Sequence, residues 1–215
     1  MVRRRATGTL ANTMRRWGFY RVAGCDEVGR GCLAGSVMAA AVILDPDRSI
    51  RGVRDSKMTT PSERERLYDA ITRRALAWAV ASASVEEIDE INIHQASLLA
   101  MRRAVLAIAP LPDLVLVDAF RIPRLTIPQQ AVPHGDQRCS AIAAASIIAK
   151  VTRDREMLGH HAVDPRYGYD RHKGYGTPAH LAAMAIHGYS PIHRRSFRPS
   201  SLFDTMDDTR KPAGA

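Results

Sequence analysis

The segment from Arg21 to Gly31 constrains this sequence more than any other, because it sets two acids between an apolar stretch and a glycine-rich loop. Residues 21–25 predict a short strand that delivers Asp26 and Glu27 to its end, where glycine permits a break. Neighbouring side chains of a regular strand point to opposite faces. Both acids therefore serve one site only if the strand ends there, or if one of them contributes its backbone carbonyl.

The loop after these acids consists of Gly29, Arg30 and Gly31. Its glycines leave bare N–H groups beside the acids, and the Arg30 guanidinium lies between them in the sequence. Acids that bind a metal, next to groups that bind an anion, indicate a phosphodiester substrate. For the two acids without this loop, a hairpin with solvated acids at its tip would be the better interpretation.

Further acids follow two other apolar segments. Residues 114–117 form a continuous apolar run, typical of the centre of a sheet, that ends on Asp118. Residues 129–132 predict another short strand, which leads to Asp136. Ligands of open α/β sheets bind beyond the carboxyl ends of the strands, so we expect these acids to converge with the first pair. Each of them also fits the plain role of a turn residue.

The remaining pattern indicates strands and helices in alternation. We expect strands over 36–44 and 78–84. Two capping boxes predict helices, one from Thr60 to about residue 74 or 76 and one from Ser84 to about residue 108. Two further helices are expected over 140–158 and from Pro178 to about residue 188. This order predicts an α/β domain with a mixed sheet flanked by helices and a helical C-terminal portion. Residues 1–20 predict a basic extension that is flexible or loosely helical, 21–198 the domain, and 199–215 a disordered tail.

Composition points to a polyanionic partner. The 215 residues include 31 Lys and Arg against 22 Asp and Glu, a net charge of +9, which favours nucleic acid. The odd cysteine count without a secretory signal predicts reduced thiols in a cytoplasmic protein. No apolar run reaches the roughly 18 residues that span a membrane. We expect a monomer.

Oxygen ligands such as these acids suit Mg²⁺ or Mn²⁺, and a pair of such ions can activate a water and stabilise the leaving oxygen of a displacement. The candidate metal ligands are Asp26, Glu27 and Asp118, because all three occur where strands run out. No zinc site competes, since the cysteines lack paired spacing and the histidines show no ligand pattern. Asp154 lies between two arginines and fits a surface ion pair.

Segments spread from about Arg21 to Phe197 resemble, in order, the ribonuclease HII family (bacterial type 2 ribonucleases H). They are Asp26-Glu-Val-Gly-Arg-Gly31, Asp55-Ser-Lys57, 87–93, Val117-Asp118, Gly135-Asp136, 143–154, 167–175 and His193-Arg-Arg-Ser-Phe197. Each segment is weak alone, but the ordered set is highly specific. The resemblance implies a ribonuclease H-like fold. It also implies a Mn²⁺- or Mg²⁺-dependent endonuclease that cleaves the RNA strand of RNA–DNA hybrids and cuts 5′ of single ribonucleotides in duplex DNA, leaving 5′-phosphate and 3′-hydroxyl ends.

The resemblance also assigns roles to residues. Asp26, Glu27 and Asp118 match the principal metal acids, Asp154 a further active-site acid, and Asp136 an acid near the site. Gly29, Arg30 and Gly31 match the loop that contacts the ribonucleotide's 2′-hydroxyl and phosphate, and Tyr175 matches the tyrosine that stacks on the sugar at the ribose–deoxyribose junction. For Tyr175, a loop aromatic that covers the core is the alternative.

Basic residues in the same segments predict a phosphate-tracking surface, although each of them also fits ordinary solvated charge. They are Lys57, Lys150, Arg153, Arg155, Lys173, Arg194 and Arg195. The chain departs from the usual family sequence at Cys32, where proline is expected, at His134, where lysine is expected, and at Met58-Thr-Thr60, which is usually richer in lysine. A catalytically weak or inactive nucleic-acid-binding module on the same fold is therefore the alternative function, and a strand-transfer enzyme is a third.

Overall fold

A computed structural model describes residues 9–53 and 59–197 and places a five-stranded sheet at the centre of the molecule. The strands are β1 (Val22–Val28), β2 (Val37–Ile43), β3 (Ala77–Ala83), β4 (Leu114–Asp118) and β5 (Gln129–Val132), in the spatial order β3-β2-β1-β4-β5. The β1–β2 and β2–β3 pairs are antiparallel, and the β1–β4 and β4–β5 pairs are parallel. The sheet is therefore mixed, which confirms the predicted fold class.

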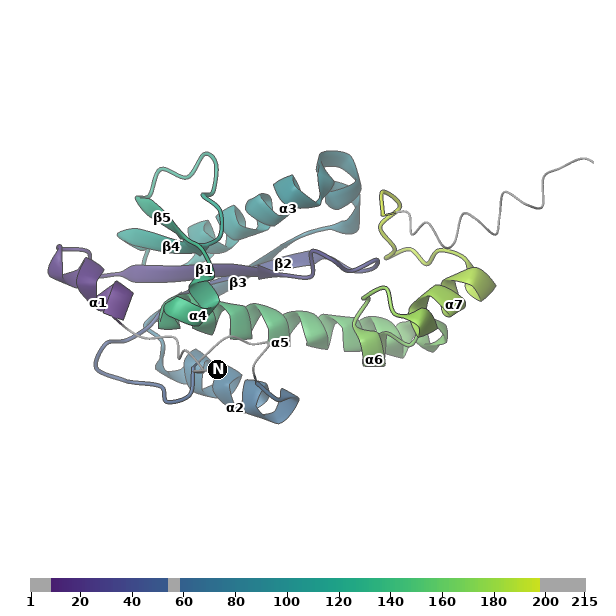
Figure 1. Cartoon of the computed structure of the whole chain (residues 1–215), viewed down its shortest axis with the longest axis horizontal. Coiled ribbons are helices and arrows are strands. Elements are labelled where there is room, and N and C mark those ends of the chain that lie inside the picture. Colours follow the sequence, from purple (N-terminus) through teal and green to yellow (C-terminus); the bar gives the residue numbers. More distant parts are fainter. Residues whose placement is uncertain (1–8, 54–58, 198–215) are drawn as a thin grey trace, which may run out of the picture.

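Helices cover both faces of this sheet (Figure 1). They are α1 (Thr9–Arg16), α2 (Pro61–Arg74), α3 (Val85–Ala107), α4 (Gly135–Arg138), α5 (Ser140–Val163), α6 (Tyr169–His172) and α7 (Pro178–His187), with a 3-10 turn, η2, at Pro165–Tyr167. Figure 1 shows α3 on one face, α5 on the other, and α2 outside α5. The far half of α5 extends beyond the sheet and carries α6 and α7.

The strand β2 is buried along its whole length because it lies between two helices. Ala39 and Ala41 face the apolar cluster that includes α3, and Ala40 and Val42 face the cluster that includes α5. Alternate side chains of a strand point to opposite faces, and alanines let a helix approach each face closely. The small side chains of this strand thus set the thickness of all three layers.

Both predicted capping boxes are present and begin the helices α2 and α3. The Glu63 N–H donates to Thr60 Oγ1 (3.3 Å), and the Thr60 N–H donates to the Glu63 carboxylate (2.9 Å). At the second box, the Glu87 N–H donates to Ser84 Oγ (3.2 Å), and the Ser84 N–H donates to the Glu87 carboxylate (2.9 Å). Each box satisfies two of the N–H groups that a helix start leaves without a partner.

Gly24 brings α5 directly against β1. A Cβ at this position would lie 2.1 Å from the Ala141 carbonyl carbon and 2.3 Å from the Ile142 nitrogen. Any other residue would push the start of α5 away from the strand. The closeness of this approach places the first turns of α5 beside the acid that follows in β1.

Three boundaries differ from those predicted. Residues 9–16 form α1, with Ala11 and Met14 buried against the sheet, so this part of the expected flexible or loosely helical extension is a helix that packs on the domain. The spacing of these two apolar residues is that of a helix face, which the surrounding basic residues obscured. The strand β1 continues to Val28, and α5 continues to Val163. The expected tail over 199–215 lies outside the described residues.

The three cysteines Cys25, Cys32 and Cys139 are free thiols and are buried. In the part of the chain that the structure describes, every helix is too short or too polar to cross a membrane.

Candidate active site

Asp26 and Asp118 lie side by side at the end of the parallel β1–β4 pair. The register pairs Cys25 with Val117, and the next residue of each strand is an acid. Asp26 is only 6% exposed. Its burial, together with the negative charges of Glu27 and Asp118, raises the pKa of Asp26 well above its ordinary value. Two carboxylates from distant parts of the chain therefore converge at this strand end, as predicted.

Asp136 joins these two acids from the first turn of α4. It is buried, and its charge adds to the rise in the pKa of Asp26. The adjacent Gly135 N–H donates to Asp118 Oδ1 at 2.7 Å, which ties α4 to the end of β4. A Cβ on Gly135 would lie 2.5 Å from Ile142 Cδ1 and 3.2 Å from Asp118 Oδ1, so a larger residue here would require these side chains to shift. We call Asp26, Asp118 and Asp136 the acid group.

Glu27 follows Asp26 directly along β1, and its charge contributes to the raised pKa of Asp26. The prediction that the strand ends before this residue was wrong. The pairing of β1 with β4 stops at Cys25, but its pairing with β2 continues through Val28. Along a regular strand the side chains of Asp26 and Glu27 alternate in direction. Glu27 instead forms an ion pair with Arg30 at 3.3 Å, which opposes the rise in its pKa caused by burial.

The donor set fits a hard divalent cation that substrate helps to hold. Among residues 9–53 and 59–197, no three acidic, histidine or cysteine side chains are grouped closely enough to hold a metal ion by themselves. Mg²⁺ takes only one or two carboxylates in many sites and completes its shell with water and substrate phosphate. Asp26 and Asp118 supply such a pair, and the mutual repulsion that raises the pKa of Asp26 is relieved by a cation.

One face of α5 connects the acid group to Tyr175. Ser146, Lys150 and Asp154 follow one another every four residues, so they lie on successive turns, about 6 Å apart. Ser146 donates a hydrogen bond that partly offsets the rise in the pKa of Asp26. Lys150 Nζ bonds the Asp154 carboxylate at 2.6 Å and lies 5.8 Å from the centre of the Tyr175 ring.

Asp154 consequently stands apart from the acid group. It lies about 12 Å along the helix axis from Ser146, the residue that reaches Asp26. Its carboxylate is occupied by Lys150 in a half-buried pair, with side chains 22% and 20% exposed. Asp154 is placed beside Tyr175 instead, where its charge contributes to the raised pKa of that tyrosine.

The glycine–arginine–glycine loop and Tyr175 form one corner of the site. Cys32 and Tyr175 pair as an isolated antiparallel bridge, and the Leu33 N–H donates to the Gly174 carbonyl at 2.8 Å. Tyr175 remains 40% exposed, with its ring open to solvent. The two segments are far apart in the sequence, so their pairing creates a surface that neither could form alone.

Two arginines predicted to track phosphate are structural instead. Arg153 and Arg194 are fully buried, and their guanidinium groups donate to backbone carbonyls. Arg153 bonds the oxygens of Ser36 (3.1 Å), Ala34 (2.9 Å) and Lys173 (2.9 Å), and Arg194 bonds those of Gly35 (2.9 Å), Arg30 (3.0 Å) and Ser36 (3.1 Å). They hold residues 30–36 in place from behind, which charge patterning in the sequence could not distinguish from surface binding.

The other predicted basic residues are dispersed. Arg155 and Arg195 are exposed, and Arg155 pairs with Glu65 at 2.5 Å. Lys173 bonds the Asp170 carbonyl. Lys57 lies outside the described residues. Lys150 is thus the predicted phosphate-contact residue that the structure places at the site itself.

Sequence reasoning missed Ser146, the partner of Asp26, and a buried group of histidines behind Tyr175. A serine in an alanine-rich helix carries no signal of its own. His172, His180 and His193 are spread over three segments, and their spacing matches no ligand pattern. Their meaning depends on the tertiary arrangement described below.

Comparison with known proteins agrees with this geometry. The sequence profile described as "Ribonuclease HII" matches residues 23–200. The chain belongs to the ribonuclease HII family. It is 57% identical over 182 residues to the ribonuclease HII of Cupriavidus necator, covering 83% of this chain and 76% of the relative. The ribonuclease HII of Dechloromonas aromatica is 57% identical over 178 residues, covering 83% of this chain and 91% of the relative.

Solved structures of ribonucleases HII and HIII share the fold. Ribonuclease H2 from Pyrococcus horikoshii aligns with a TM-score of 0.72 and 27% identity, covering 89% of this chain and all of that chain. The ribonuclease HII of Archaeoglobus fulgidus, solved as a complex with PCNA, aligns with a TM-score of 0.67 and 28% identity, covering 86% of this chain and 99% of that chain. Bst-RNase HIII in complex with Mn²⁺ aligns with a TM-score of 0.67 and 21% identity, covering 88% of this chain and 71% of that chain. At this identity the similarity is one of fold. This ribonuclease HII is thus a nuclease that hydrolyses phosphodiester bonds in RNA–DNA hybrids.

Proposed function

We propose that this ribonuclease HII cleaves the RNA strand of hybrids and also cuts 5′ of single ribonucleotides embedded in duplex DNA, leaving 5′-phosphate and 3′-hydroxyl ends. The observation that carries this proposal is the corner made by residues 29–31 and Tyr175, which one face of α5 connects to the acid group through Lys150. An enzyme that finds one ribose in a DNA strand must pair its 2′-hydroxyl, the group that separates RNA from DNA.

Gly31 supports contact with substrate because the fold does not require glycine there. Its φ is not positive, and a Cβ would meet no atom within 4 Å. Gly29, by contrast, has a φ of +91° and would place a Cβ 2.3 Å from Arg153 Nε. A glycine without an internal need is expected where a ligand approaches the backbone closely. At Gly31 that ligand is the sugar-phosphate backbone of the scissile strand.

Tyr175 is suited to recognise the sugar on the other side of this corner. Its ring is exposed although its backbone is held at a bridge, and the Lys150 ammonium lies over the ring face. A site built to pair a hydroxyl rejects analogues that lack it much better than an apolar slot does. Gly31 and Tyr175 together then discriminate ribose from deoxyribose.

The acid group is proposed to act with Mn²⁺ or Mg²⁺, held by the Asp26 and Asp118 carboxylates and by an oxygen of Glu27. When bound, such ions supply an activated water and neutralise charge on the leaving oxygen. Asp118 is oriented for this task by the Gly135 N–H, and Asp26 by Ser146. Bst-RNase HIII, which shares the fold, was solved with Mn²⁺. Asp136 and Asp154 are proposed as supporting acids, and Lys150 as a phosphate contact.

The departures at Cys32 and His134 leave this arrangement intact, which weighs against an inactive binding module, and Met58 of the third departure lies outside the described residues. Cys32 is buried and pairs with Tyr175, so it maintains the corner. His134 adopts a left-handed conformation, with φ 53°, at the start of α4 and leaves Asp136 in the acid group.

A cleavage assay with three duplexes tests the proposal. One carries a single ribonucleotide, one is all DNA, and one is an RNA–DNA hybrid, each incubated with Mn²⁺, Mg²⁺ or chelator. We expect cuts in the first and third, a 5′-phosphate at each cut, and none with chelator. Cleavage of the all-DNA duplex would favour a strand-transfer type of enzyme. Binding without any cutting would favour the inactive module.

A matched pair of glycine variants tests the corner. Gly31→Ala should fold as the wild type does and lose about 100-fold in cleavage at the single ribonucleotide, because the added methyl displaces the strand. Gly159→Ala is the control, since a Cβ there also meets nothing within 4 Å and the position lies on the exposed surface of α5. Equal activity of the two variants would contradict the proposed contact.

A further inference from the structure

Three buried histidines lie directly behind Tyr175 and take no part in the proposed chemistry. His172, His180 and His193 are 9%, 0% and 1% exposed. The rings of His172 and His180 stack with their centres 4.3 Å apart, and His180 Nε2 lies 3.0 Å from His193 Nε2. They come from α6, α7 and the segment after α7, so they join the last three parts of the domain.

The partners of these rings fix where each proton resides. The Ser190 N–H can only donate, and it lies 2.8 Å from His193 Nδ1, so that nitrogen accepts. A neutral His193 therefore carries its proton on Nε2 and donates to His180 Nε2. His180 in turn carries its proton on Nδ1, which donates to the Tyr175 carbonyl at 2.9 Å.

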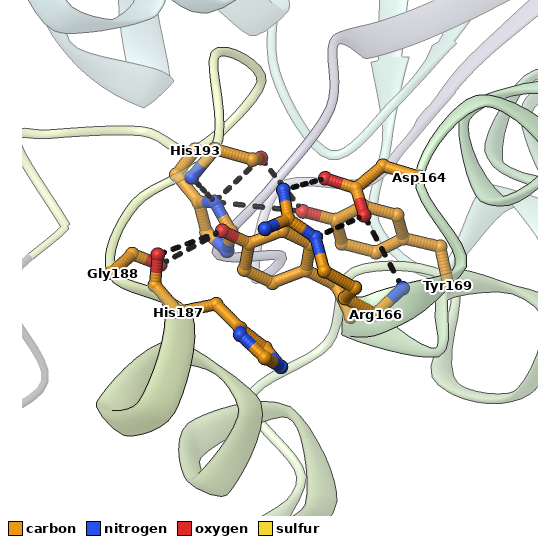
Figure 2. Close-up of polar contacts among 8 residues, drawn as sticks. Asp164, Arg166, Tyr169, His187, Gly188 and His193 are labelled. Carbon is orange, nitrogen blue, oxygen red and sulfur yellow. Dashed lines mark hydrogen bonds and ion pairs between the residues drawn. The ribbon is translucent and has the colours of Figure 1, made fainter.

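A second set of contacts supports the same assignment. Figure 2 shows Tyr169 and His193 with their polar contacts, beside the Asp164–Arg166 ion pair. Ser190 Oγ lies 2.8 Å from His193 Nδ1 and 2.9 Å from the Tyr169 hydroxyl. Because Nδ1 can only accept, the Ser190 hydroxyl and the Ser190 N–H share its one lone pair, and the serine oxygen is left to accept from the Tyr169 hydroxyl. The hydrogen bonds then run in one direction from Tyr169 to Tyr175.

Both rings of the pair are neutral near pH 7. Burial lowers the pKa of His180 and of His193 to about 4. Protonation of His180 at Nε2 would set two N–H groups against each other across the 3.0 Å contact, and protonation of His193 at Nδ1 would set a second N–H against that of Ser190. The titratable groups that face the pair are Tyr167, Tyr169, His172 and Tyr189.

The chain of hydrogen bonds ends on the backbone of the residue that the proposed function uses. The Tyr175 carbonyl accepts from His180 and also from the Thr177 N–H at 2.8 Å. On the other side of Tyr175, the Gly174 N–H donates to His172 Nδ1 at 3.2 Å, and the Tyr175 N–H donates to the His172 carbonyl at 3.0 Å. The peptide groups flanking the exposed ring are thus held by histidines.

We propose that His180 and His193 are positioning residues that fix the backbone of Tyr175, and through it the ring that meets the ribose. This inference rests on the proposed function of Tyr175. His193 orients His180, and His180 holds the Tyr175 carbonyl, while the ring itself stays free to contact substrate.

Paired substitutions separate the two nitrogen atoms of His180. The amide of His180→Asn lies near the position of Nδ1 and can still donate to the Tyr175 carbonyl. The longer His180→Gln places its amide near Nε2, so it keeps the contact with His193 and loses the one with Tyr175. His187→Gln is the matched control, because His187 is exposed on the same helix.

Cleavage of a duplex with one ribonucleotide gives the first readout. We expect His180→Gln to lower kcat/KM about tenfold, the effect of removing one of the two hydrogen bonds that fix the Tyr175 carbonyl, and His180→Asn to lower it less. In a Tyr175→Ala background, His180→Gln should have no further effect, since it acts through the tyrosine. Additive losses, or full activity of His180→Gln, would overturn the inference. Absence of cleavage by the wild type would instead refute the proposed function.

Nitrogen NMR of the histidine rings in the wild-type protein gives a second readout that does not depend on whether the variants fold. At pH 7 the spectra should show His180 protonated on Nδ1 alone and His193 on Nε2 alone. A doubly protonated ring, or the opposite tautomers, would overturn the inference.

Discussion

The two ends of α5 bury polar groups in contrasting ways. At the Ser146 end, Asp26, Asp118 and Asp136 are like charges gathered in a poorly hydrated place, and their mutual repulsion raises the pKa of Asp26. At the far end, Arg153, Arg194 and the histidines are buried too, but their nitrogens bond backbone carbonyls and one another. In the first region like charges repel one another, and a bound cation would relieve this repulsion. In the second region the buried polar groups are satisfied by hydrogen bonds that hold the backbone in place.

The largest effect is expected from neutralising the acid group. Asp26→Asn and Asp118→Asn should each reduce cleavage about 1000-fold or more, because several kcal/mol of metal-based stabilisation are lost. Duplex binding in chelator should be nearly unchanged. Single-turnover cleavage and a binding titration measure both. Full activity of either variant in Mg²⁺ would contradict a catalytic role for the acid group, and with it the proposed difference between the two regions.

Loss of a buried arginine should instead destabilise the fold. Arg194→Ala removes three hydrogen bonds to buried backbone carbonyls, and we expect the free energy of unfolding to fall by about 3 kcal/mol or more. Arg195→Ala, at the exposed neighbour, should change it by less than about 0.5 kcal/mol. Denaturant unfolding compares them. Similar values for the two would show that the far end is not held by these bonds.

The pH dependence of stability sharpens the comparison. Since the pKa of Asp26 is raised in the folded state, the folded protein binds more protons than the unfolded chain between the two pKa values. In chelator, the stability of the wild type should therefore fall as pH rises through the raised pKa. Asp26→Asn should lack this loss and melt higher than the wild type at neutral pH.

Thermal unfolding from acid to neutral pH, with chelator throughout, measures the difference. The two proteins should converge as the pH falls toward the ordinary pKa of an aspartate. A wild type that melts higher than Asp26→Asn at neutral pH would mean that the acid group is already compensated within the protein.

The smallest effect belongs to the middle of α5. Lys150→Met removes a half-buried ion pair with Asp154 and should change the free energy of unfolding by no more than about 1 kcal/mol. It should also weaken the salt dependence of duplex binding if Lys150 meets a phosphate. A change in stability as large as that of Arg194→Ala would place this turn within the rigid region.

The part of the site that the sequence predicts well is the part set by strand ends. Asp118 and Asp136 were placed by apolar runs that terminate beside them, and the parallel register brings Asp26 next to Asp118. The predicted end of the first strand is wrong, because a local pattern cannot show that β1 loses its pairing with β4 after Cys25 and keeps its pairing with β2 through Val28.

The far end of α5 escaped prediction for a different reason. Arg153 and Arg194 look like surface charges in the sequence, and their burial depends on carbonyls of residues 30–36 that fold against them. The histidine chain likewise has meaning only after α7 and the following segment return to Tyr175. Helix starts were easier, since the capping boxes at Thr60 and Ser84 depend on residues three apart.

The bridge between Cys32 and Tyr175 has a consequence for how the enzyme meets its substrate. The two segments that we propose to contact the ribose share backbone hydrogen bonds, so their relative position is fixed when the protein folds and substrate does not have to order them. The conformational entropy of aligning them is therefore lost on folding and not on substrate binding.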